Sequence, residues 1–365
     1  MKFLHIRQIS FFILLSGAVF SLNLHGQKKV EEHEFVPLGF LVNDLNEFQA
    51  GFAAKLAVKN INDHGGINGK PLKLITRSVE GSWGAGSGEV VDLVFNEKVT
   101  AILGSIDGRN SHLAEQVIAK TQVLYLSAWS SDPSLSKAYV PWYFSLVPTD
   151  DQQATLLLDE VNVKNGFQKI FVVHDHTYDA EQALKSLIEG TKGRDRLKIR
   201  SFGYPPTASG SEGFLAEVNR NGAEAVILIG TQLPLLKILN QLEELNETIP
   251  IYTHLSVQGS QEFISNRIEY INRFYVIGSG KGMHSDLYGF ESAFIKQYDQ
   301  KPGPMATFVY DGILILADAL KQSENHDLSL QQTMSQINYQ GLRAKVQFDS
   351  QGRVKNPGEL RILKE

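Results

Sequence analysis

The chain contains no cysteine among its 365 residues. This absence excludes thiol catalysis, cysteine-ligated zinc, iron–sulfur clusters and disulfide bonds. It also excludes a lipid attached to an N-terminal cysteine. Any functional site must therefore be built from other side chains.

An excess of charge of one sign is also lacking. The chain has 35 Lys and Arg against 40 Asp and Glu, and no run of five or more basic residues. Because binding to nucleic-acid phosphates needs a concentrated basic surface, we do not expect a nucleic acid as a partner. The 42% hydrophobic and 21% charged residues are ordinary for a globular protein, and the length favours two or three domains.

Long hydrophobic runs are missing except at the N-terminus. Residues 9–20 are mostly apolar and follow Lys2 and Arg7, but the run is shorter than the ~20 residues that a membrane span needs. We therefore predict a cleaved secretory signal peptide over residues 1–27, with a membrane anchor as the alternative. The protein would then be periplasmic or secreted, without stable membrane insertion. Outside the cytosol, ATP and reduced nicotinamides are scarce, so we expect no cofactor.

The remaining chain alternates short apolar runs with amphipathic segments, which is typical of an α/β fold. A first series of strands is predicted at residues 36–42, 72–75, 101–104, 123–126 and 143–146. A second series is predicted at residues 170–173, 199–202, 225–229, 249–253 and 274–277. Each series predicts a doubly wound parallel sheet with helices on both faces, so we expect two lobes.

The C-terminal region predicts that the chain returns between the lobes. Two helices, residues 287–298 and 305–321, follow one another before a third short helix. Residues 344–348 and 359–363 then look like the strands of a hairpin. We assign residues 34–148 and about 278–335 to the first lobe, and residues 149–277 and about 336–365 to the second.

Three segments resemble cofactor or metal motifs but lack a required element. The glycine-rich residues 84–89 place Glu89 where a dinucleotide loop needs its third glycine, and a carboxylate there would repel pyrophosphate. Residues 278–282 lack the spacing of a phosphate loop and predict a turn or hinge. His174 and His176 are two residues apart as they leave a strand, so they point to opposite faces, and we expect no metal.

Polar residues gather where the predicted strands end, and ligands of open parallel sheets bind beyond these ends. The candidate ligand-binding residues are Ser105, Arg109, Asn110, Ser111, Trp129, Ser130 and Ser131 in the first lobe, and Tyr178, Gln232 and His254 in the second. Hydroxyls, amides and aromatic rings suit holding a small polar molecule, and no nucleophile–base pair is visible. Each serine could instead cap a helix, Arg109 could face solvent and Trp129 could lie in the core.

One motif is specific to a known family. Residues 60–72 read NINDHGGINGKPL, which resembles the INxxGGINGxPL signature of the leucine/isoleucine/valine-binding family of type 1 periplasmic binding proteins. The resemblance continues through residues 101–105, 132–135 and 148–152 and covers nearly all of residues 34–363. It implies two lobes with three crossovers that close on a small ligand, which is handed to an ABC transporter permease or reported to a signalling partner.

The family's ligand positions carry over unevenly. The resemblance implies that Asn110 or Ser111, together with Ser131, binds a ligand carboxylate, and that Tyr178 is the aromatic residue of the second lobe. However, Gln232 replaces an expected aromatic residue. No acidic residue near His254 matches the family's partner for a ligand ammonium group.

We therefore expect α-amino acids to bind poorly. Arg109 would pair with a carboxylate and Trp129 would stack on its apolar body. If an ammonium group binds instead, the nearest acidic candidates are Asp107, Asp132, Asp175 and Asp179.

Taken together, the sequence predicts an exported, non-enzymatic solute-binding protein for a small polar or anionic ligand. One alternative is a sensing or partner-binding protein that has the same fold and no role in transport. Another is an exported enzyme on this scaffold, since fold does not fix function.

Overall fold

The computed structural model describes residues 34–45, 48–81, 84–205, 212–245, 248–265, 273–278, 289–342 and 344–362. Residues 34–365 belong to one compact unit. The predicted signal peptide, residues 1–27, lies outside the described residues. Among the helices that are described, none combines the length and the apolar character that a membrane crossing requires.

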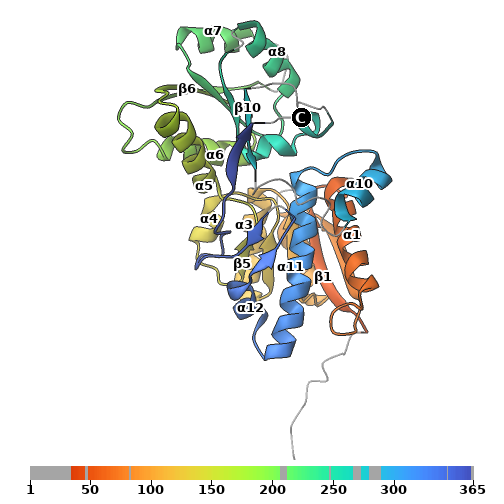
Figure 1. Cartoon of the computed structure of the whole chain (residues 1–365). Helices are drawn as coiled ribbons and strands as arrows, with labels where there is room; N and C mark the ends of the chain where they lie inside the picture. Colours follow the sequence, from red (N-terminus) through yellow and green to blue (C-terminus); the bar gives the residue numbers. More distant parts are fainter. Residues whose placement is uncertain are drawn as a thin grey trace, which may run out of the picture. The chain divides into compact units, whose positions relative to one another are not determined.

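The first sheet consists of parallel strands only (Figure 1). Its order is β2-β1-β3-β4-β5, with β1 at Val36–Val42, β2 at Leu72–Ser78, β3 at Ala101–Ser105, β4 at Leu124–Ser127 and β5 at Tyr143–Ser145. All residues of β1, β3, β4 and β5 are buried. Burial on both faces explains why these strands are continuous apolar runs in the sequence.

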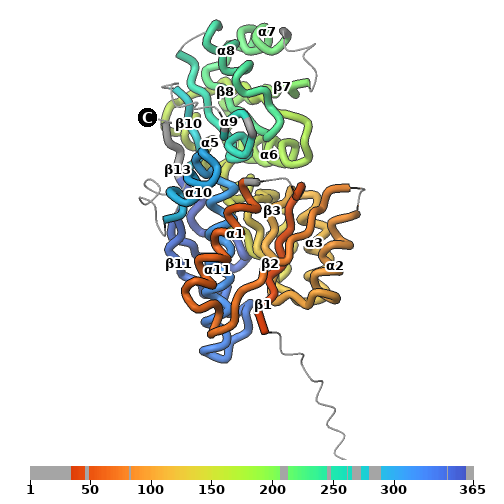
Figure 2. Tube along the Cα trace, turned by 90° about the vertical axis from the view of Figure 1, so that its right-hand side faces the viewer, coloured from red at the N-terminus to blue at the C-terminus, as the bar shows by residue number. Residues whose placement is uncertain are grey.

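Helices cover both faces of the first sheet. On one face, α1 (Phe48–Asp63) and α11 (Pro304–His326) lie side by side and pack on Leu38 and Phe40 (Figure 2). On the other face, α2 (Ala85–Phe95) and α3 (Gly108–Thr121) pack on Leu41 and Ile102. Neighbouring strand residues thus enter opposite cores, as the period of two in a strand requires.

The second sheet has the order β13-β10-β9-β8-β6-β7. Its strands are β6 (Lys169–His174), β7 (Lys198–Gly203), β8 (Ala225–Ile229), β9 (Ile251–Thr253), β10 (Phe274–Gly278) and β13 (Glu359–Ile362). All pairs are parallel except the edge pair of β10 with β13. The two doubly wound sheets expected from the sequence are therefore confirmed.

The second sheet is also covered on both faces. One core combines α5 (Asp150–Leu158), the π-helix η1 (Asp159–Lys164) and α6 (Tyr178–Glu189) with Ile227. The opposite core combines α7 (Glu212–Arg220) and α8 (Leu235–Leu245) with Leu228. The shorter elements are α4 (Pro133–Lys137), the 3-10 helix η2 (Leu255–Gly259), α9 (Gln261–Ser265), α10 (Phe290–Tyr298), α12 (Leu330–Gln336), β11 (Tyr339–Gln340) and β12 (Lys345–Val346).

The predicted C-terminal hairpin is wrong. β12 pairs with β11, and β13 pairs antiparallel with β10 of the second sheet. The edge of β10 offers unpaired backbone groups, and residues 359–362 satisfy them. The chain thus passes between the sheets three times: from β5 to α5, from β10 to α10, and from β12 to β13.

Part of the C-terminal region beyond residue 335 packs with the first sheet. Ile337, Leu342, Val346 and Phe348 are buried in the core that contains α1 and α11. Only β13 joins the second sheet. The packing therefore continues the first lobe through Phe348.

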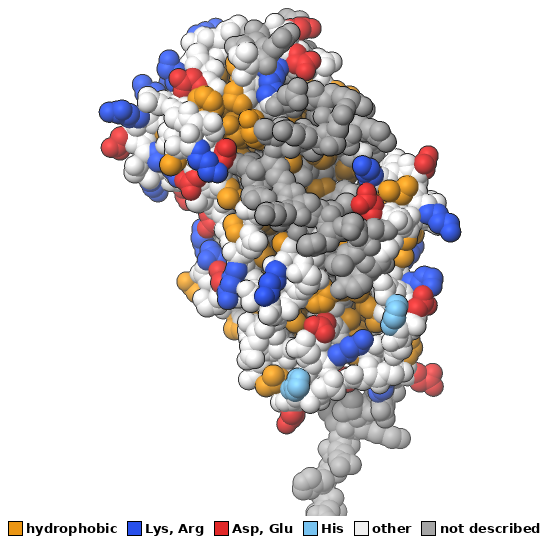
Figure 3. All heavy atoms as spheres, in the orientation of Figure 1, with side chains coloured by type: hydrophobic (Ala, Val, Ile, Leu, Met, Phe, Trp, Pro, Cys, Tyr) orange, Lys and Arg blue, Asp and Glu red, His pale blue; other side chains and the backbone are white. Residues whose placement is uncertain are grey.

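Charged side chains of both signs are spread over the surface. On the face shown in Figure 3, Lys and Arg are interspersed with Asp and Glu wherever the structure describes the surface. The distribution of surface charge therefore does not indicate the charge of a binding site, which depends on the residues that line it.

Replacing Phe40 with alanine tests the first core. The side chain is fully buried in the α1–α11 core, so Phe40→Ala is expected to lower the free energy of unfolding by about 3–5 kcal/mol. The matched control is Phe95→Ala, since Phe95 is 61% exposed and should change stability by no more than about 0.5 kcal/mol. Urea unfolding followed by circular dichroism measures both, and equal effects would contradict the assigned core.

Candidate functional site

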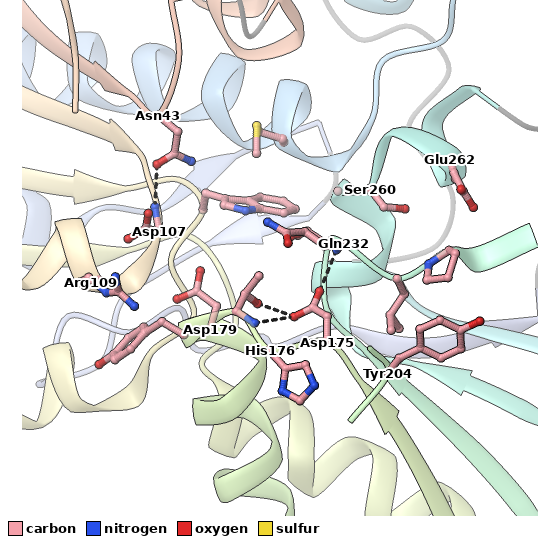
Figure 4. A pocket seen from close by; sticks show the side chains of 18 of the residues that line it. Asn43, Asp107, Arg109, Asp175, His176, Asp179, Tyr204, Gln232, Ser260 and Glu262 are labelled. Carbon is pink, nitrogen blue, oxygen red and sulfur yellow. Dashed lines mark hydrogen bonds between the residues drawn. The ribbon is translucent and has the colours of Figure 1, made fainter. Parts of the chain in front are cut away.

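A cavity of about 1100 Å³ opens where strands of both sheets end (Figure 4). The first lobe contributes Asn43, Asp107, Arg109, Trp129 and Met305. The second lobe contributes Asp175–Asp179, Tyr204, Pro205, Thr231–Pro234, Lys237, Gly259, Ser260 and Glu262. Parallel strands bring their carboxyl ends to one edge of a sheet, so loops that are distant in sequence meet here.

Four of the predicted site residues line this cavity: Arg109, Trp129, Tyr178 and Gln232. The Arg109 guanidinium lies 5.6 Å from the centre of the Tyr178 ring. The Trp129 side chain is 8% exposed and belongs to the first core as well as to the cavity wall. Which of the four contacts a ligand stays a prediction.

The predicted serines do not line the cavity. Ser105 and Ser130 are buried, and neither hydroxyl has a hydrogen-bond partner among the described residues. The Ser111 hydroxyl is also buried and lies 3.4 Å from the Tyr125 hydroxyl. The Ser131 carbonyl accepts a hydrogen bond from the Asp150 backbone N–H at 2.7 Å.

Asn110 is part of the cap that begins α3. Asp107 is the N-cap, and its Oδ1 accepts from the Asn110 backbone N–H at 2.8 Å while Oδ2 accepts from Asn110 Nδ2 at 3.0 Å. This is the usual role of aspartate at a helix start. Asn110 therefore supports the cavity through Asp107 and does not line it.

A carboxylate of the second lobe also binds the start of α3. The Gly108 backbone N–H donates to Asp179 Oδ1 at 2.9 Å. A Cβ on Gly108 would lie 2.7 Å from that oxygen, so only glycine allows this approach. The positive end of α3 is thus already occupied by two carboxylates of the protein itself.

Asp175 holds together two loops of the second lobe. Its Oδ1 accepts from the Thr177 backbone N–H at 2.9 Å and from the Thr177 hydroxyl at 2.6 Å, and its Oδ2 accepts from the Gln232 backbone N–H at 2.7 Å. These bonds join the loop after β6 to the loop after β8 (Figure 4). The buried Asp175 side chain therefore shapes the second-lobe wall of the cavity.

Asp132 connects the first lobe to the second. The Tyr178 hydroxyl donates to Asp132 Oδ2 at 2.9 Å, and His112 Nε2 lies 3.0 Å from the same oxygen. Burial alone would raise the pKa of Asp132, but hydrogen bonds from His112, Ser134 and Tyr178 outweigh it and lower that pKa to about 2. In turn, Asp132 and Glu115 raise the pKa of His112 to about 9. Asp132 is thus a charged anchor for Tyr178.

His254 lies outside the cavity and stabilises the second lobe next to the first crossing. It caps η2, and its Nδ1 lies 2.8 Å from the Ser256 hydroxyl. Its buried Nε2 lies 3.2 Å from Asp150 Oδ1 at the start of α5. Burial raises the pKa of Asp150. The predicted ligand role of His254 therefore has no support from its position.

Three of the four aspartates considered as partners for a ligand ammonium group line the cavity: Asp107, Asp175 and Asp179. Burial is the main cause that raises the pKa of Asp179 to about 7, and the nearby carboxylates of Asp107, Asp150 and Asp132 raise it further. A carboxylate is therefore available at the site, although none follows β9 where the family resemblance led us to look.

Of the segments that resemble metal or cofactor motifs, residues 84–89 have a structural role. Among the described residues, no group of three His, Asp or Glu could hold a metal ion. Residues 84–89 begin α2, with Gly84 as the N-cap at φ 97°, and Glu89 lies 3.6 Å from Arg77. Of the glycine-rich segment 278–282, only Gly278 lies within the described residues.

Several lining residues were missed in the sequence. Tyr204 directly follows β7, so reading that strand's end would have found it. Lys237 lies in α8, Ser260 lies just before α9 and Glu262 lies within α9, and no strand ends at these positions. Only the folded arrangement brings these three residues to the cavity.

Two parallel sheets, three chain crossings and a cavity at the strand ends define a two-lobed binding protein. Residues 50–360 match the family described as periplasmic binding protein, and the chain belongs to this family. The resemblance seen in the sequence is therefore confirmed.

Known relatives agree with this assignment. An "amino acid binding protein" of Pseudomonas aeruginosa is 25% identical over 197 residues, which span 52% of this chain and only 51% of the relative. LivJ from Streptococcus pneumoniae, solved in complex with isoleucine, has a TM-score of 0.72 at 18% identity and covers 90% of this chain and 99% of its own. A solute-binding protein of an ABC transporter from Rhodopseudomonas palustris, solved with 3,4-dihydroxybenzoic acid, has a TM-score of 0.72 at 18% identity, covering 89% and 92%. At these identities the solved structures show a shared fold.

Asp179→Asn is expected to stabilise the protein more at pH 8 than at pH 5. Asp179 has a pKa of about 7 in the folded protein and about 3.9 when unfolded, so its contribution to stability is present at low pH and is lost as the pH rises to 7. Asparagine avoids the buried charge and can still accept from Gly108. The gain at pH 8 should be on the order of 1–4 kcal/mol by thermal unfolding.

The control is Asp63→Asn on the exposed end of α1, which should change stability little at either pH. Equal effects of Asp179→Asn at pH 5 and pH 8 would contradict the raised pKa of this carboxyl group.

Proposed function

We propose that the protein captures one small solute in the cavity between its lobes and delivers it to the permease of an ABC transporter. The capture takes place outside the cytosol, in the periplasm or after secretion. The observation that carries this proposal is the cavity of about 1100 Å³, whose walls come from the strand ends of both lobes. A molecule bound there is enclosed only when the two lobes meet around it.

Contacts between the lobes show how closure would work. The Tyr178 hydroxyl binds Asp132, the Asp179 carboxylate binds the start of α3, and Trp129 packs against Gly259. A solute that contacts both walls stabilises the closed arrangement by its differential affinity for that state. The three crossings are the segments that would bend.

The family and the relatives support a binding role. The proteins that this chain resembles are named as binders of an amino acid, or were solved with isoleucine or a dihydroxybenzoic acid. The cavity, at about 1100 Å³, is slightly larger than the ~300–1,000 Å³ that is typical of small-molecule sites. We propose binding without a chemical step. The sensing alternative has the same binding step and differs only in the partner that recognises the closed form.

Ligand-induced stabilisation tests the proposal. Protein that has been unfolded and refolded to remove bound solute is screened by thermal shift against amino acids, amides, carboxylates and amines. A ligand at ~100 times its dissociation constant should add ~2.7 kcal/mol to stability. The same ligand should reduce the radius of gyration in small-angle scattering.

An obstructed cavity provides the control for that screen. Gln232→Trp places an indole at an exposed position of the cavity wall and should abolish the shift. Gln322→Trp places the same ring at an exposed position of α11 outside the cavity and should leave the shift unchanged. A ligand that binds both variants equally well would contradict the assigned site.

A further inference from the structure

We propose that the solute bound in this cavity is a cation, an amine, amidine or guanidine without a carboxylate group. The inference rests on the proposed function, because it concerns the ligand of the same cavity. It differs from the sequence-based expectation of a polar or anionic ligand.

Carboxylates outnumber cations among the described residues that line the cavity. Asp107, Asp175, Asp179 and Glu262 line it, against Arg109 and Lys237. In the part of the chain that the structure describes, no Lys, Arg or His lies within 4.0 Å of the carboxylate of Asp107, Asp175 or Asp179. Asp175 is buried and Asp107 and Asp179 are partly buried. Carboxylates removed from water are usually paired with a cation, and these three have none within that distance.

Several backbone donors at the start of α3 in the first lobe are already used. An anion at a helix start needs free N–H groups, but the Gly108 N–H donates to Asp179 and the Asn110 N–H donates to Asp107. The Asp107 N–H itself donates to Asn43 Oδ1 at 3.3 Å. An anionic ligand would therefore have to displace Asp179 and would also face its negative charge.

Three backbone donors of the second lobe are used in the same way. Asp175 accepts from the N–H groups of Thr177 and Gln232, and the Ser256 hydroxyl accepts from the Gly230 N–H at 2.9 Å. In both walls, carboxylates of the protein thus hold N–H groups that an anionic ligand could otherwise use.

Arg109 does not reverse this balance. Its guanidinium lies against the Tyr178 ring, in cation–π geometry. Among the lining residues that the structure describes, there are one arginine and one lysine against four carboxylates, so these residues carry a net negative charge when all are ionised.

Asp179 offers the most direct contact for a cation. Its Oδ1 accepts from Gly108, whereas its Oδ2 has no hydrogen-bond partner among the described residues. Burial raises the pKa of this carboxyl group to about 7, and a cation beside it would offset the cost of burying the charge. The rings of Trp129 and Tyr204, which also line the cavity, suit the apolar body or the charged head of an amine.

Matched probes test the charge preference. Three carbon skeletons, n-pentyl, cyclohexylmethyl and 2-phenylethyl, are each supplied as the amine, the carboxylate and the primary amide, together with leucine and phenylalanine. Binding is measured at pH 8, where Asp179 is ionised, by thermal shift and then by isothermal titration. At least one amine is expected to bind ten times or more tightly than its carboxylate and its amide.

Charge-removing variants then locate the contact. Asp179→Asn should weaken the amine ten- to a hundredfold, since a hydrogen bond to a charged group is lost. Asp63→Asn, which removes a surface carboxylate outside the cavity, should not change it. Asp175→Asn should weaken the amine too. If that variant does not fold, because Asp175 holds two loops together, Asp179→Asn alone decides the question.

Two results would overturn the proposal. The first is tighter binding of the carboxylates, the amides or the amino acids than of every amine. The second is an amine whose affinity is unchanged by Asp179→Asn. Either result is compatible with solute binding and refutes only the proposal that the ligand is a cation. If none of the probes produces a response, the result counts against both proposals.

Discussion

Backbone N–H groups at the ends of parallel strands and at helix starts must find acceptors when they are removed from water. In this protein the acceptors at the cavity are the carboxylates of Asp107, Asp175 and Asp179. Each of them fixes a loop, and Asp179 also joins the second lobe to the first. The need of these N–H groups for acceptors therefore accounts for both the geometry of the site and its acidic character.

Asp132 and Asp179 both join the two lobes, but only Asp132 is paired with a cationic side chain. Asp132 is neutralised by His112 and then holds the Tyr178 hydroxyl, so it contributes to the junction of the lobes. Asp179, the residue after Tyr178, has no such cationic neighbour among the described residues. Two neighbouring positions of α6 thus bind the first lobe in different ways: Tyr178 through a paired charge, and Asp179 through a helix N-terminus.

Local patterns in the sequence were sufficient to predict both sheets. The apolar runs at 36–42 and 225–229 became buried strands because helices cover both faces of each sheet. The C-terminal hairpin could not be predicted correctly, because the partner of β13 is β10, about eighty residues earlier in the chain. Pairing across such a separation leaves no local signal.

The site was only partly predictable for a similar reason. The end of a strand shows which residues are near the cavity, but side-chain direction decides which of them enter it. Trp129 enters the cavity, while Ser130 beside it is buried in the first lobe without lining it. Lys237, Ser260 and Glu262 reach the cavity from helices and a helix start, so no pattern of strand ends could identify them.

The packing of Trp129 on Gly259 gives the protein an internal optical reporter. A methyl group on Gly259 would lie 2.3 Å from Trp129 Cζ2, so the indole of the first lobe lies directly against the backbone of the second. The emission of an indole depends on how much water surrounds the ring. Separation of the lobes would hydrate this ring. In a variant that keeps Trp129 and replaces Trp83 and Trp142, intrinsic fluorescence would therefore follow opening and closing in real time without an attached dye.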